Sequence, residues 1–143
     1  IMKNQKQKNN EKGFRGYIFS RSIGTNFIPQ RVQNLVIRDF AERNKIFFKL
    51  SSTEYNMKNC FLMLNSLTKN IKNIDGIIFY SIEMIFELKK IDEFFKKLLL
   101  KKKTIYFALE EIKVSSSNDV KKINRILKIK KDSMKSNLIN KNV

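Results

Sequence analysis

The reactive side chains of this sequence are carboxylates, phenols and hydroxyls, because the chain contains no histidine and only one cysteine. Without an imidazole, neither a Ser-His-Asp triad nor a histidine-ligated metal site can form. Glu54, Glu110 and Tyr55 are the candidates for general acid–base catalysis, which requires that burial raise a glutamate pKa toward neutrality. Ser20 is a candidate nucleophile that a lysine or a carboxylate would have to activate. Cys60 is expected to be an inert core residue, and we expect neither a metal nor a cofactor.

A second set of polar side chains is suited to holding an anion. Arg21 could grip a phosphate or a carboxylate with two parallel hydrogen bonds. A helix expected after Pro29 would direct its N-terminus, where free backbone N–H groups favour anions, toward the same place. The remaining candidate ligand-binding residues are Gln30, Arg31, Gln33, Asn34, Thr53, Tyr80 and Ser81. Each of them could instead serve structure alone, because Ser, Thr and Glu at strand ends commonly cap turns and helices.

The hydrophobic pattern predicts strands and helices that alternate along the chain. The expected strands cover residues 16–19, 45–50, 76–80 and 104–109. The expected helices cover residues 30–44, about 59–73, 89–100 and 119–129, with Asn59 as the cap of the second. This alternation predicts a single three-layer α/β domain, in which helices flank a small, four-stranded, mainly parallel sheet. The carboxyl ends of parallel strands share one rim, where such folds bind ligands, so the candidate residues are expected to converge there.

Most of the formal charge of +17 lies near the chain ends. Residues 1–12 carry a net charge of +3 and residues 121–143 a net charge of +7, which leaves +7 for the 108 residues between them. We expect a disordered basic tail over 1–12, an α/β domain over 13–130 and a frayed basic tail over 131–143. This distribution argues against specific nucleic-acid binding by the domain, although some attraction to anionic ligands remains.

Three features of the sequence predict a cytoplasmic protein. No run of about 18 apolar residues is present, so we expect no membrane span. The polar first twelve residues lack the apolar stretch of a secretory signal. The single cysteine cannot form a disulfide within the chain, which fits a reducing compartment.

Five separate blocks resemble the sporadic carbohydrate cluster protein family, whose members occur in bacterial surface-polysaccharide gene clusters. The blocks are GYIFSR at 16–21, PQRVQNLVIRDF at 29–40, STEYNM at 52–57, DGIIFYS at 75–81 and FALEE at 107–111. The resemblance implies a role in lipopolysaccharide or related glycan biosynthesis, with a sugar phosphate or a nucleotide sugar as the ligand. The chain departs from the family pattern after residue 81, where a proline is missing, and at Phe40, where tyrosine is common.

A weaker resemblance, at the level of the fold, connects the chain to the catalytic domain of serine recombinases. These domains also begin with a short strand that ends in a serine, here Ser20, followed by a helix that bears glutamine. They carry arginines after the third strand, whereas residues 82–88 contain none. We therefore expect a resolvase-like or flavodoxin-like fold without transferring the recombinase function.

Three functions stay open at this point. The first is binding of a phosphorylated or nucleotide-linked sugar at the strand-end rim, with acid–base chemistry if the protein is catalytic. The second is a recombinase-like, nucleic-acid-associated module. The third is a non-catalytic partner of a carbohydrate enzyme. The helix surface with Phe86, Phe94 and Phe95 is the first candidate for a homodimer contact.

Overall fold

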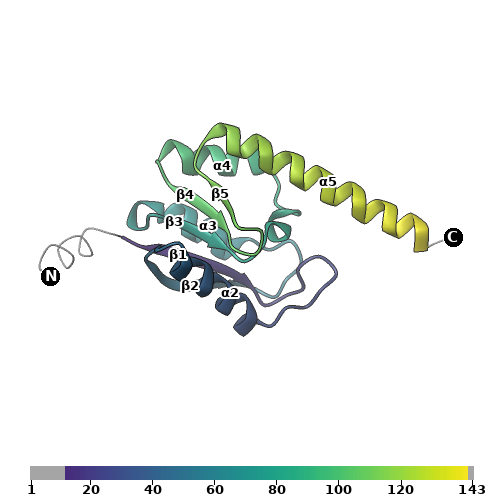
Figure 1. Ribbon diagram of the computed structural model, residues 1–143, viewed down its shortest axis with the longest axis horizontal. Coiled ribbons are helices and arrows are strands. Elements are labelled where there is room, and N and C mark those ends of the chain that lie inside the picture. Colours follow the sequence, from purple (N-terminus) through teal and green to yellow (C-terminus); the bar gives the residue numbers. More distant parts are fainter. Residues whose placement is uncertain (1–11, 142–143) are drawn as a thin grey trace, which may run out of the picture.

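Five strands form one sheet in the computed structural model, which describes residues 12–141 (Figure 1). The strands are β1 (Phe14–Phe19), β2 (Phe48–Glu54), β3 (Gly76–Phe79), β4 (Thr104–Phe107) and β5 (Ile112–Val114). The helices are α2 (Gln30–Arg43), α3 (Leu62–Lys69), α4 (Ile91–Leu100) and α5 (Ser117–Lys141), with the 3₁₀ turns η1 (Ile71–Asn73) and η2 (Ile82–Ile85). The expected basic tail at 1–12 lies outside the described residues except for Lys12.

The strand order β2-β1-β3-β4-β5 makes β1 and β3 central, and all four residues of β3 are buried. Strands β1 to β4 run parallel, as expected for strands joined through helices. The expected α/β class with a mainly parallel sheet is confirmed. The fifth strand was not expected: β5 returns antiparallel to β4 through a tight turn in which Glu111 has a φ of 56°. Only three residues long, it is too short for a clear alternating pattern.

Aromatic residues pack on both faces of the sheet. Tyr17, Phe79 and Phe107 are paired in register across the central strands, and their neighbouring ring centroids lie 5.3 and 5.2 Å apart. The ring of Phe94 from α4 packs edge-on against Phe79, so α4 covers this face. On the opposite face, Tyr106 contacts Phe40 of α2. The sheet is therefore the middle of three layers, as expected.

Helix α5 is much longer than expected, and its second half extends away from the body of the domain (Figure 1). Its first half is anchored in the core by the buried side chains of Ile123 and Leu127. Asn124 donates a hydrogen bond of 2.9 Å to Asp92 of α4. The structure continues the helix to Lys141, through residues that were expected to form a frayed tail from residue 131. The lysine-rich composition does not interrupt it, because lysine is a good helix former.

Strand β2 begins and ends later than expected. Its second half is polar, yet these residues pair with β1 through the backbone: Ser51 with Gly16 and Glu54 with Phe19. The apolar run at 45–50 includes only the first three residues of this edge strand. Which residues pair with β1 depends on contacts between the two strands, and the hydrophobic pattern of one segment does not record them. Asn59, expected to cap α3, instead has a left-handed φ of 59°, and the helix starts at Leu62.

Gly76 allows β3 and β4 to approach each other closely. A Cβ atom at this position would collide with the Thr104 carbonyl oxygen and lie 2.6 Å from the Phe14 ring. Backbone cannot move aside as a flexible side chain can, so we expect Gly76→Ala to lower the free energy of unfolding by about 3 kcal/mol. Urea denaturation would measure the loss. In Gly24→Ala, where only the Glu83 side chain is close, the positive φ should cost about 1 kcal/mol. Equal losses in the two variants would contradict the steric argument.

Candidate functional site

The carboxylate of Glu54, at the end of β2, joins three elements at the rim of the sheet. Its Oε2 accepts a hydrogen bond of 2.6 Å from the Tyr17 hydroxyl of β1. The backbone N–H groups of Met63 and Leu64, in the first turn of α3, donate to the same oxygen at 3.1 and 3.2 Å. Its other oxygen accepts from the Tyr55 N–H at 3.0 Å. Glu54 therefore caps α3 with a buried negative charge, as favoured at a helix N-terminus.

This hydrogen bonding decides the protonation of both partners. Burial alone would raise the pKa of Glu54, but the bonds from the Tyr17 hydroxyl and from the N–H groups of Met63, Tyr55 and Leu64 outweigh it and lower the pKa below its ordinary value. Burial, together with the neighbouring Glu54 carboxylate, raises the pKa of Tyr17 strongly. A carboxylate held ionised in this way is a poor general acid at neutral pH. The acid–base role of Glu54 stays a prediction that these contacts do not favour.

Arg21 and Gln33, both expected to hold the ligand, make extensive contacts within the protein. Nη1 of Arg21 donates to the Cys60 carbonyl at 2.9 Å and to the Tyr55 carbonyl at 3.2 Å, and the guanidinium carbon lies 4.0 Å from the centre of the Phe19 ring. Gln33 is fully buried and clamps the end of β1, accepting from the Phe19 N–H and donating to its carbonyl. These two side chains position the β1 end and the loop before α3.

A second carboxylate, Glu110 after β4, caps the segment that follows β3. It accepts a 2.6 Å hydrogen bond from the Ser81 hydroxyl and a 3.0 Å bond from the Ile82 N–H at the start of η2. Lys130 of α5 places its Nζ 3.8 Å from Glu110 and 3.5 Å from Glu83. The ion pairs attach the middle of α5 to the carboxyl end of the sheet.

The other predicted site residues are spread around the rim. The Ser20 hydroxyl donates to the Glu54 carbonyl at 2.9 Å, and the Asn34 amide oxygen accepts from Ser51 at 2.6 Å. Tyr80 is buried, and its pKa is raised first by that burial and then by the charges of Glu110 and Glu83. The residues that remain are exposed or half-buried, with no side-chain hydrogen bond to residues 12–141: Gln30, Arg31, Thr53 and Tyr55. Cys60 is half-buried, its sulfur 3.7 Å from a Glu54 oxygen.

A cavity of about 360 Å³ lies at the carboxyl ends of β1 and β3, closed on one side by α5. We call it the strand-end cavity. Its chemical groups are two aromatic rings, three cations and two carboxylates, with small polar residues from the loop after β1. The charged and aromatic members are Phe19, Phe86, Arg21, Lys131, Lys135, Glu83 and Glu87. The remaining lining residues are Ser22, Gly24, Thr25, Met84 and Met134.

Of the twelve site residues that the sequence predicted, Arg21 alone lines this cavity. The structure brings in Lys131 and Lys135, which the sequence analysis assigned to a tail. Their spacing of four residues places them on one helix face, and this was the signal that could have identified them. Nη2 of Arg21 is buried and has no hydrogen-bond partner among the described residues.

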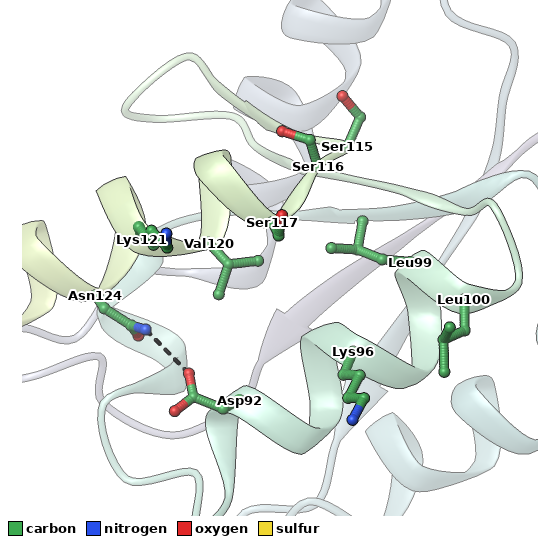
Figure 2. A pocket seen from close by; sticks show the side chains of 10 residues that line it. All are labelled: Asp92, Lys96, Leu99, Leu100, Ser115, Ser116, Ser117, Val120, Lys121 and Asn124. Atoms are coloured by element: carbon green, nitrogen blue, oxygen red, sulfur yellow. Dashed lines mark hydrogen bonds between the residues drawn. The ribbon is translucent and has the colours of Figure 1, made fainter.

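A larger cavity, of about 620 Å³, separates α4 from α5 (Figure 2). Its walls are mostly apolar, and its one acidic residue, Asp92, already accepts the hydrogen bond from Asn124 that Figure 2 draws. At the start of α5 beside it, the Ser116 hydroxyl accepts from the Asp119 N–H at 3.4 Å, and the Asp119 carboxylate accepts from the N–H groups of Ser115 and Ser116. With few unengaged polar groups converging there, the strand-end cavity is the stronger candidate for ligand binding.

Within residues 12–141, no group of three or more acidic or cysteine side chains is arranged to hold a metal ion. No helix in that part of the chain has the length and apolar character needed to cross a membrane.

Comparisons with protein-family models and with curated proteins gave no match to the sequence. A solved structure similar to the chain is the N-terminal catalytic domain of TP901-1 integrase, a serine recombinase domain. The two share 15% sequence identity with a TM-score of 0.52, and the match covers 85% of this chain and 97% of that domain. This likeness confirms the expected resolvase-like fold, and at such low identity it shows the fold alone. The resemblance to the carbohydrate cluster family stays a prediction.

Because the pKa of Glu54 is lower in the folded than in the unfolded chain, ionised Glu54 stabilises the fold above its unfolded pKa of about 4.3. That stabilisation is lost as the pH falls through the lower, folded value. We expect Glu54→Gln to reduce the free energy of unfolding by about 3 kcal/mol at pH 7, since it removes a buried acceptor of several hydrogen bonds. Urea denaturation at neutral and acidic pH should show the difference from the original protein shrinking with acidification. A difference independent of pH, or an equal one for the exposed Glu42→Gln, would contradict this assignment.

Proposed function

We propose that this protein binds a phosphorylated sugar, either a sugar phosphate or a nucleotide sugar, in the strand-end cavity. The observation that carries the proposal is the combination of groups lining that cavity. Lys131 and Lys135 supply cations suited to phosphate, and Glu83 and Glu87 supply acceptors suited to sugar hydroxyls. The half-buried ring of Phe86 offers apolar surface against which a sugar ring can pack. The volume of about 360 Å³ lies within the range of small-molecule sites.

The location of the cavity supports the same proposal. In parallel α/β sheets, ligands bind beyond the carboxyl ends of the strands, where the strand order changes direction. Here the chain crosses from β1 outward to β2 and then back over β1 to β3. The cavity is lined from the segments that follow β1 and β3, the two strands on either side of that switch.

The proposal is for ligand binding, and a catalytic role would be an addition to it. Glu54 and Glu110, the carboxylates expected to do acid–base work, are occupied by hydrogen bonds that position α3 and η2. Burial and the charges of Glu110 and Glu83 raise the pKa of Tyr80, which makes its hydroxyl a weaker acid than an ordinary phenol. Any reaction would use groups in the cavity itself, of which Glu83 and Glu87 are the carboxylates. The sequence blocks that resemble the carbohydrate cluster family suggest surface-polysaccharide biosynthesis as the setting.

A thermal-shift panel with sugar 1-phosphates, nucleotide sugars and the matching neutral sugars would test the proposal. We expect the phosphorylated compounds to raise the melting temperature and the neutral sugars to have little effect. The double variant Lys131→Ala/Lys135→Ala should weaken binding at least about tenfold, because two charge-assisted contacts are removed. Lys128→Ala removes a lysine from the same helix outside the cavity and should leave binding unchanged. No shift with any phosphorylated sugar, or equal losses in both variants, would contradict the proposal.

The net charge of +17 and the recombinase-like fold favour nucleic-acid association as a second candidate function. Fluorescence anisotropy of a labelled DNA duplex at about 50 and 200 mM salt separates the two candidates. If charge alone attracts DNA, we expect binding without sequence preference that falls by orders of magnitude between these salts. Tight binding that persists at the higher salt and prefers one duplex sequence would instead favour the nucleic-acid function over the sugar ligand.

A further inference from the structure

A separate cavity, of about 270 Å³, lies between the sheet and α3. We call it the Arg15 cavity. Arg15 is the second residue of β1, and Asn73 and Ile74 lie just before β3, so this side of the cavity is at the amino ends of the strands. Ser52 and Met63 extend the cavity along β2 and α3. The strand-end cavity is at their carboxyl ends, and the two cavities share no lining residue. The lining residues of the Arg15 cavity are Arg15, Ser52, Met63, Ser66, Leu67, Asn70, Asn73 and Ile74.

The guanidinium of Arg15 is held in a fixed orientation without a carboxylate partner. Its Nε donates to the Leu50 carbonyl at 2.9 Å, and its Nη2 donates to the Ser52 hydroxyl at 2.9 Å. In the part of the chain that the structure describes, the cations that form ion pairs are Arg43 and Lys130. Nη1 of Arg15 makes no hydrogen bond to any of residues 12–141. A positioned, half-buried guanidinium that lacks a counter-charge attracts an anion.

Neutral polar groups across the cavity complete the set of donors. The side chains of Ser66 and Asn73 make no hydrogen bond to residues 12–141, and the Asn70 amide donates only to the Ser66 carbonyl. Hydroxyl and amide groups of this kind can donate to the oxygens of an anion that the guanidinium attracts. No acidic residue lines the cavity, whereas the strand-end cavity contains two.

We infer that the Arg15 cavity binds a compact oxyanion, a phosphate or carboxylate group, between the guanidinium of Arg15 and the polar side chains of α3 and η1. The bound group would connect the start of β1 to the C-terminal half of α3. Glu54 already ties the N-terminus of α3 to the sheet, so an anion here would fix the other end of the same helix. This site is independent of the proposed sugar ligand, because the two cavities have no lining residue in common.

Titration of the ¹⁵N-labelled full chain with inorganic phosphate, at ionic strength held constant with sodium chloride, would test the inference by NMR. We expect saturable shifts at the Arg15 Nε–H and at the backbone amides of Ser52, Ser66 and Asn73. Acetate in a second arm distinguishes a site for a planar carboxylate from one for a tetrahedral phosphate. A shift that is not saturable, or that spreads over the lysine-rich surfaces without reaching these amides, would overturn the inference.

Two variants keep the test interpretable. Arg15→Lys retains the charge but loses the fork, and we expect phosphate binding to weaken about tenfold. Because Arg15 also holds β2, the double variant Ser66→Ala/Asn73→Ala provides a change that removes no hydrogen bond among the described residues, and it should weaken binding about threefold. Asn65→Ala, on the side of α3 that faces α4, is the matched control. Binding unchanged in both cavity variants, or weakened equally by Asn65→Ala, would refute the site. The Lys131→Ala/Lys135→Ala variant should leave phosphate binding in the Arg15 cavity unchanged. Failure of this inference can therefore be distinguished from failure of the sugar proposal.

Discussion

The hydrogen bonds to Glu54 connect three elements at the carboxyl end of the sheet. One buried carboxylate receives the Tyr17 hydroxyl from the central strand, the Tyr55 N–H from the loop that follows its own strand and two N–H groups from the first turn of α3. An isolated negative charge in this position would be costly, and the cost is offset because nearly every lone pair has a donor. The Arg21 guanidinium, which bonds the carbonyls of Tyr55 and Cys60, holds the same loop from its other side.

Glu110, which follows β4, plays the same part for the segment after β3. It accepts hydrogen bonds from the Ser81 hydroxyl and the Ile82 N–H. A carboxylate therefore caps the start of η2, as Glu54 caps the start of α3. Two carboxylates that look catalytic in the sequence thereby fix the segments after β2 and β3. Their common physical basis is the set of unpaired N–H groups at the start of any helical segment, which favour a negative oxygen. The charged side chains of the strand-end cavity lie mainly elsewhere, on α5 and on the segment from η2 to Glu87.

The long helix α5 changes the meaning of the positive charge. As a tail, residues 131–143 would only add solvated lysines to a basic chain. As a helix anchored through Ile123, Leu127 and the ion pairs of Lys130, it brings Lys131 and Lys135 to the strand-end cavity. Those two lysines face two carboxylates and two aromatic rings across one space. Part of the positive charge that predicted a general attraction to anions is therefore located at one cavity, beside identified side chains.

The alternation of strands and helices and the mainly parallel sheet could be predicted from the sequence, because side-chain periodicity records which face of each element is buried. The absence of histidine likewise excluded whole classes of chemistry. The boundaries of β2 and the existence of β5 could not be predicted, since both depend on backbone pairing with distant strands. Composition also does not show which polar side chains are occupied by hydrogen bonds within the protein. Gln33 clamping β1, Glu54 capping α3 and Lys131 reaching the cavity are contacts between residues far apart in the chain, and only the tertiary structure sets those distances.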